Sequence, residues 1–176
     1  QTCALPISEK KRMSDELARH RHRLEELVAE RTAELAEANR ALAQRAAEIA
    51  DLYDRAPCGY HSLAADGTII AVNQTELDLL GYSREEYVGH KVGEFMTAES
   101  RALFRQRFAE FRRTGHVRDL AFDWLRKDGS ILPVLISADL VGNASGEFLF
   151  SRSTMVDNSE RSRREREIAE MQAELA

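Results

Sequence analysis

Residues 65–92 of this chain read ADGTIIAVNQTELDLLGYSREEYVGHKV, and they are the most informative residues for predicting its fold. Asp66-Gly67 lies between two short strand-like runs and is a dipeptide that tolerates the positive φ of a tight turn. Asn73 then predicts a helix N-cap, with Glu76 at the third helical position as in a capping box. Gly81 is expected to end that helix. The stretch therefore predicts a β-hairpin that runs directly into a short capped helix.

The residues downstream predict more helix and then only strands. The sequence SREE at 83–86 repeats the capping pattern, and residues 98–113 form a longer expected helix with an apolar face. Lys127-Asp128-Gly129 and Asn143–Gly146 are turn sequences between strand-like runs. The expected strands are 59–64, 68–72, 117–126, 130–140 and 147–156. This order predicts an α+β domain: a five-stranded antiparallel sheet with short helices on one face.

Both flanks of this domain predict amphipathic helices. Residues 13–55 contain no Gly or Pro and repeat apolar residues every seven positions, which is typical of a coiled coil. Arg31 and Arg45 interrupt the seam, but arginine can extend its charge out of a two-stranded seam. We expect a homodimer paired through this helix. The predicted seam residues are Leu24, Val28, Leu35, Leu42, Ile49, Leu52, Ile168, Met171 and Leu175.

Composition excludes several classes of protein. A formal net charge of −5 argues against a general nucleic-acid binder. No apolar run is long enough for a membrane span, and no secretory signal is visible. The two cysteines, Cys3 and Cys58, form no metal or redox motif, so a reducing cytoplasm fits best. We expect neither a catalytic constellation nor a metal site.

Three stretches in this order and spacing resemble a PAS domain of bacterial signalling proteins. They are residues 65–92, WLRKDGSILPVLIS at 124–137 and FSRSTMVDNSER at 150–161. The helical segment LEELVAERTAELAEANRAL at 24–42 resembles the connector found beside such domains. The resemblance implies a PAS fold over about residues 53–161.

The resemblance also implies roles for particular residues. VDNSER resembles the exit motif Asp-Ile-Thr-Glu-Arg, which gives Asp157, Glu160 and Arg161 the role of relaying signals to the exit helix. The cofactor is unknown. Reactive-cysteine flavin photochemistry is excluded because no cysteine lies between residues 59 and 176. A haem-ligating histidine on the long helix is not expected, because Phe104 stands where the haem-binding members of the family carry it.

A ligand pocket is expected between the sheet and the helices. Its candidate residues are His61, Phe104, Phe108, Trp124 and Arg152. For His61 we favour a histidine satisfied at the domain surface over one that faces the pocket. Trp124 shares a strand face with Leu120 and Phe122, which is typical of core. Arg152 is either an inward cation that needs an anionic partner or, as we favour, a charge at the sheet surface.

The expected organisation is a segment of non-native origin at 1–8, a signalling helix at 9–55, a PAS domain at 56–157 and a connector helix at 158–176. The expected function is a sensory and dimerisation module that relays a signal to an effector outside this chain, such as a histidine kinase. The residues present should have no enzymatic activity of their own. The alternatives are a ligand-free dimerisation scaffold and the sensor of a diguanylate cyclase or a transcriptional regulator.

Overall fold

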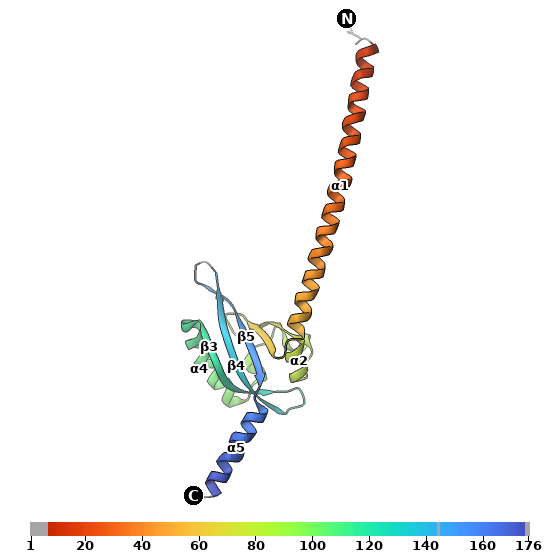
Figure 1. Cartoon of the computed structure of the whole chain (residues 1–176). Coiled ribbons are helices and arrows are strands. Elements are labelled where there is room, and N and C mark those ends of the chain that lie inside the picture. Colours follow the sequence, from red (N-terminus) through yellow and green to blue (C-terminus); the bar gives the residue numbers. More distant parts are fainter. Residues whose placement is uncertain (1–6, 144, 175–176) are drawn as a thin grey trace. The chain divides into compact units, whose positions relative to one another are not determined.

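The computed structural model describes residues 7–143 and 145–174, so the predicted seam residue Leu175, most of the segment 1–8 and Ala144 lie outside the described residues. The chain divides into two units, one up to Ala50 and one from Asp51. The elements, shown in Figure 1, are α1 (Ile7–Asp54), β1 (Gly59–Leu63), β2 (Ile69–Val72), α2 (Gln74–Leu80), α3 (Arg84–Tyr87), the 3-10 helix η1 (Val92–Phe95), α4 (Ala98–Thr114), β3 (His116–Leu125), β4 (Ile131–Gly142), β5 (Phe148–Asp157) and α5 (Ser159–Glu174).

The first unit is almost wholly the long helix α1. Its 48 residues span about 70 Å at 1.5 Å per residue, and none of its described side chains is buried. The predicted seam residues of α1 are among the most exposed apolar side chains described, from 61% for Leu24 to 74% for Leu52, and Ile168 and Met171 on α5 are 51% and 56% exposed. A helix that keeps an apolar stripe in water is typical of one that pairs with another helix.

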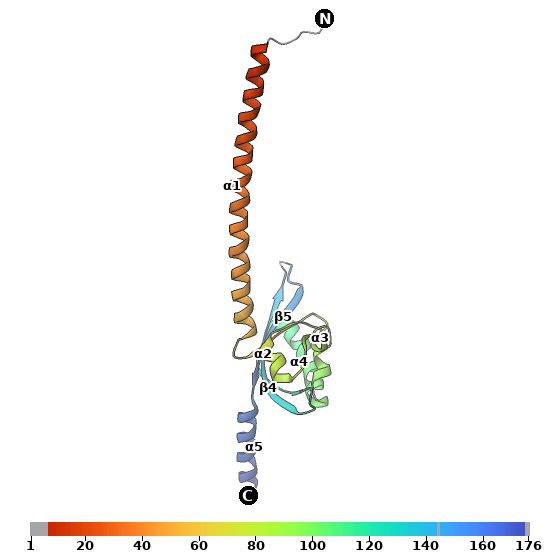
Figure 2. The ribbon, with the colours of Figure 1, turned by 90° about the vertical axis from the view of Figure 1, so that its right-hand side faces the viewer.

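The second unit contains a five-stranded sheet in the order β2-β1-β5-β4-β3, in which every neighbouring pair is antiparallel. The helices α2, α3 and α4 lie on one face of this sheet (Figure 2). The predicted α+β class and the five strands are therefore confirmed, with strand ends that differ by one or two residues. The 3-10 helix η1 was not predicted.

The core fills the space between the sheet and these helices. Side chains alternate along β4, where Leu132, Val134, Ile136 and Ala138 are buried and the residues between them are more exposed. On β3 the predicted stripe is confirmed: Phe122 and Trp124 are buried and Leu120 packs against the same cluster.

Glycines end α2 and α4, at Gly81 and Gly115. Gly81 adopts φ +78°, and its backbone N–H donates to the carbonyl of Leu77 at 2.7 Å. This left-handed conformation is one that residues with a Cβ rarely adopt, so the sequence stops α2 at this point. The turn that follows leads into α3, whose N-cap Ser83 donates its backbone N–H to Glu86 at 2.9 Å.

Candidate functional site

A cavity with a volume of about 40 Å³ lies between the sheet and α4. It has room for only a few water-sized positions, since one water needs roughly 10–15 Å³ by the same measure. Most of its wall is apolar and aromatic, and the polar atoms come from a small group of side chains. The residues that line it include His61, Phe104, Arg107, Phe108, Trp124, Ser151 and Ser153.

The structure brings together four of the five residues predicted for the pocket. His61, Phe104, Phe108 and Trp124 all line this cavity. Phe104 and Phe108 stack on each other with ring centroids 5.0 Å apart, and both are only partly buried. They form the wall that α4 contributes. Ligand binding by these residues stays a prediction.

Arg152 does not belong to the cavity, so its place among the pocket residues was wrong. It is exposed, its guanidinium lies 5.8 Å from the centre of the Phe150 ring, and its cross-strand neighbour is Asp139. Ser151 and Ser153 are the inward residues on either side of it, because side chains alternate between the faces of a strand. Arg152 is a surface charge, which is the interpretation the sequence favoured.

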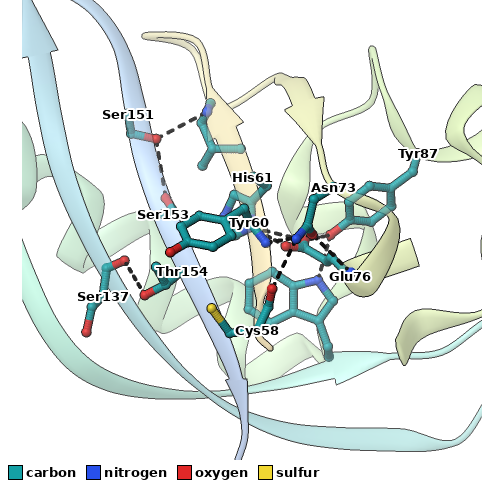
Figure 3. A network of polar contacts seen from close by, with 12 residues as sticks. Cys58, Tyr60, His61, Asn73, Glu76, Tyr87, Ser137, Ser151, Ser153 and Thr154 are labelled. Carbon is teal, nitrogen blue, oxygen red and sulfur yellow. Dashed lines mark hydrogen bonds and ion pairs between the residues drawn. The ribbon is translucent and has the colours of Figure 1, made fainter. Parts of the chain in front are cut away.

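His61 is buried, with 3% of its surface exposed, and the preferred prediction of a surface histidine was therefore wrong. Its Nδ1 lies 3.0 Å from both carboxylate oxygens of Glu76, a residue with no exposed surface (Figure 3). The sequence placed Glu76 in a capping box. Asn73 does accept the backbone N–H of Glu76 at 3.1 Å, but the Glu76 carboxylate points into the core instead of back to the N-cap.

The other carboxylate contact of Glu76 is the hydroxyl of Tyr87, at 3.0 Å. The indole N–H of Trp124 donates to the Tyr87 oxygen at 3.1 Å. Burial and the neighbouring Glu76 carboxylate raise the pKa of Tyr87 well above its usual value, so the hydroxyl keeps its proton. These four side chains form a continuous buried polar network that ends at the cavity.

Gly59 makes room for this network. A Cβ at this position would lie 3.0 Å from the Glu76 Cβ, 3.0 Å from its Oε2 and 3.1 Å from the Met155 Cβ. The close approach of β1 to the Glu76 carboxylate therefore requires a residue without a side chain.

Asn73 connects the network to the end of α1. Its amide nitrogen donates to the carbonyls of Tyr53 and Cys58, at 2.9 and 3.0 Å. Its amide oxygen accepts the backbone N–H of Tyr60 at 2.8 Å as well as that of Glu76. One fully buried side chain thus joins the last turn of α1, the start of β1 and the start of α2.

The hydrogen bonds and ion pairs of the residues predicted to relay signals lie at the start of α5. Asp157 accepts the backbone N–H of Ser159 at 2.8 Å, which caps the start of α5. Glu160 pairs with Arg164 at 3.4 Å and Arg161 with Glu165 at 2.8 Å, all within α5. The junction between β5 and α5 is tied to β4 by the backbone N–H of Asn158, which donates to the carbonyl of Pro133 at 2.9 Å.

Sequence reasoning missed Glu76 and Tyr87 as parts of the site. A glutamate in the first turn of a helix is ordinarily explained by capping, so nothing in its local pattern indicated burial. Among the described residues, no three His, Cys, Asp or Glu side chains cluster as metal ligands would. No described helix is both long and apolar enough to cross a membrane.

Comparisons with known proteins agree on the fold. The PAS domain family matches residues 57–160, which is more than half of the chain. The phosphoserine phosphatase RsbP of Bacillus subtilis is 32% identical over 97 residues, which are 54% of this chain and 24% of that protein. The chain therefore spans about a quarter of the length of this curated relative.

Two solved structures illustrate the structural likeness. The PAS domain of an HTR-like protein from Haloarcula marismortui superposes with a TM-score of 0.61 at 23% identity, covering 69% of this chain and 98% of that one. A domain of a sensory box sensor histidine kinase/response regulator from Geobacter sulfurreducens gives 0.54 at 20% identity, covering 66% and 96%. At these identities the likeness shows the fold alone.

Proposed function

The chain belongs to the PAS domain family, and from this premise we propose that it is a sensory and dimerisation module that relays a signal to an effector domain through α1 and α5. The observation that carries the proposal is the apolar stripe of α1. Val28, Leu35, Leu42 and Ile49 recur every seven residues and are each between 63% and 67% exposed. Leaving these side chains in water is costly, whereas a second copy of the same helix would bury them.

The cavity supports a sensory role over a ligand-free scaffold. A domain that only dimerises has no need for an internal space lined by aromatic side chains and a few buried polar groups. Phe104 and Phe108 leave one wall of the cavity only partly covered, which offers a small molecule a route to His61. The bound molecule would act by favouring one of two packings of the helices.

We propose a histidine kinase as the effector and the cytoplasm as the location. The support is the resemblance of the flanking helix at 24–42 to connectors of such proteins, together with the likeness to a domain of a sensory box sensor histidine kinase/response regulator. The RsbP relative is a phosphoserine phosphatase, which favours an enzymatic effector of another class as the second candidate.

Dimerisation is tested by sedimentation of the whole chain. Replacing Leu35 and Leu42 together with asparagine should shift the dimer toward monomer, because both residues lie in the stripe. The matched control replaces Ala36 and Ala43, one position further along the helix and outside the stripe, with asparagine. A wild-type monomer, or equal effects of the two pairs, would contradict the proposal.

The relay is tested in the protein that carries the effector. With Cys3 and Cys58 replaced by serine, single cysteines at Ile168 and Met171 would lock the exit helices of a dimer in different registers. We expect the locked registers to give distinct effector activities. Equal activity in all registers would show that α5 does not transmit the signal.

A further inference from the structure

The buried network has one consistent direction of hydrogen bonding. An indole N–H can only donate, so Tyr87 accepts from Trp124 and its own hydroxyl proton points to Glu76. Glu76 therefore accepts at Oε1. The Nδ1 of His61 is equally distant, at 3.0 Å, from both oxygens of Glu76. Equal distances are expected when an ionised carboxylate shares one N–H between its two oxygens. A protonated carboxyl group would instead donate its single proton from one of the two oxygens.

The charge of Glu76 needs a buried cation, because an unpaired carboxylate without contact to water is strongly unfavourable. Arg107 lies at the cavity but is exposed and pairs with Glu110 at 3.1 Å. Arg84 donates to the carbonyl of Val72 and lies near Asp54 at the surface. His61 is the group in direct contact with the Glu76 carboxylate, at 3.0 Å from both oxygens, and is therefore the one that can balance its charge.

A doubly protonated His61 has a second donor, Nε2–H, which finds no hydrogen-bond partner among the described residues. The ring lines the cavity, and its cross-strand neighbour on β5 is Ser153, another lining residue. Ser153 lies 3.4 Å from the Ser151 hydroxyl, which already accepts the backbone N–H of Leu63 at 3.1 Å. The contact between the two serine hydroxyls uses only one of their two protons, so the other hydroxyl proton is free to donate. The polar end of the cavity therefore presents hydrogen-bond donors to a ligand.

We propose that the cavity takes a small neutral molecule with a carbonyl oxygen at its polar end, and that Glu76 sets this preference by keeping His61 protonated on both ring nitrogens. The carbonyl oxygen accepts from His61 Nε2 and from the serine hydroxyl, and the apolar body lies among the aromatic rings. A carboxylate ligand is disfavoured because it would bury a second negative charge next to Glu76. This inference rests on the sensory function proposed above, to which it adds the class of ligand.

The test uses acetone and 2-propanol as probes, which have the same heavy-atom shape but differ in their polar group. Binding to the whole chain is followed by NMR titration of the Trp124 indole resonance. Wild type should bind acetone at least as tightly as 2-propanol. In Glu76→Gln, a neutral His61 presents a lone pair at Nε2. The affinity for acetone should therefore fall about tenfold, while the affinity for 2-propanol should change less than threefold. The control is Glu94→Gln, which alters the exposed His90–Glu94 pair and should change neither affinity.

Nitrogen NMR of wild type gives a second readout that does not depend on binding. His61 should show the signature of a ring protonated on both nitrogens, and Glu76→Gln should remove it. Equal weakening of both probes in Glu76→Gln would assign Glu76 a purely structural role and overturn the proposal. Exclusion of acetone by wild type, or no binding of either probe, would also overturn it. The sensory function itself is tested separately by the α5 cross-linking experiment, in which equal effector activity in all locked registers would contradict it.

Discussion

Glu76 and His61 are separated by 15 positions in the sequence, yet their side chains meet at 3.0 Å in the core of the domain. Glu76 belongs to a seven-residue helix and His61 to the central part of β1. The contact holds the start of α2 against the sheet at the polar end of the cavity. It is stabilising only while both partners are present, because either one alone would leave a buried group unpaired.

Replacing Glu76 with alanine should therefore destabilise the fold by about 3 kcal/mol, the usual cost of breaking a buried pair. The measurement is urea unfolding followed by the fluorescence of Trp124. Glu94→Ala breaks the exposed His90–Glu94 pair and should cost about 1 kcal/mol at most. Similar losses of unfolding free energy in the two variants would show that the buried Glu76–His61 pair stabilises the fold no more than an exposed pair does.

Tyr87→Phe should cost about 2 kcal/mol, because the lost hydroxyl both accepts from Trp124 and donates to Glu76. Tyr82 is a matched control, since its hydroxyl makes a longer, 3.3 Å contact to the carbonyl of Leu125 in a partly buried position. Tyr82→Phe should cost less than half as much. Thermal unfolding of both variants under one set of conditions makes the comparison.

Gly59→Ala should destabilise the domain by about 2 kcal/mol, because the added methyl group meets Glu76 and Met155 at 3.0 to 3.1 Å. Gly93→Ala adds a methyl group 3.3 Å from the flexible Arg101 side chain, which can move aside, so we expect a smaller loss. Chemical unfolding of the two variants tests this ranking. A crystal structure of Gly59→Ala should show Glu76 displaced from His61.

Acid should weaken a surface contact of the β1–β2 turn. Hydrogen bonds from the Lys91 ammonium, 2.5 Å away, and from Thr68 hold the pKa of Asp66 well below its usual value. A carboxyl group whose pKa is lower in the folded protein stabilises it above the unfolded pKa near 4, and this contribution disappears as the pH falls through the folded pKa. Lys91→Met should therefore flatten the loss of stability between pH 5 and pH 3. Lys11→Met, on the exposed surface of α1, should leave that slope unchanged.

Local patterns in the sequence were enough to predict the strands, the long helices and the short capped helix α2. Asp66-Gly67 and Gly81 act through the backbone conformations that they favour, so their effect depends on few distant residues. Burial of His61 and Glu76 depends on which strand and helix meet across the core. Both residues are polar, and the usual rule places polar residues outside, which is why the surface was preferred for His61.

For Arg152 the sequence favoured the surface but still kept the residue among the candidate pocket residues. It stands between two inward serines, so the alternation of β5 would have removed it from the pocket if the inward direction of Ser151 and Ser153 had been known. Two small polar residues gave no apolar signal to define the inner face of that strand. The burial of these serines follows from the pairing of β5 between β1 and β4, and a single strand does not contain that information.

The four side-chain hydrogen bonds of Asn73 bear on where this domain can be cut or transplanted. Family similarity begins at Pro57, but one partner of the Asn73 side chain, the carbonyl of Tyr53, comes before it. In a chimera joined at Pro57, a foreign segment that does not place a carbonyl where that of Tyr53 lies would leave a buried amide proton of Asn73 without its acceptor. The portable unit therefore begins at Tyr53, and fusion proteins that keep the last turn of α1 should retain communication that shorter ones lose.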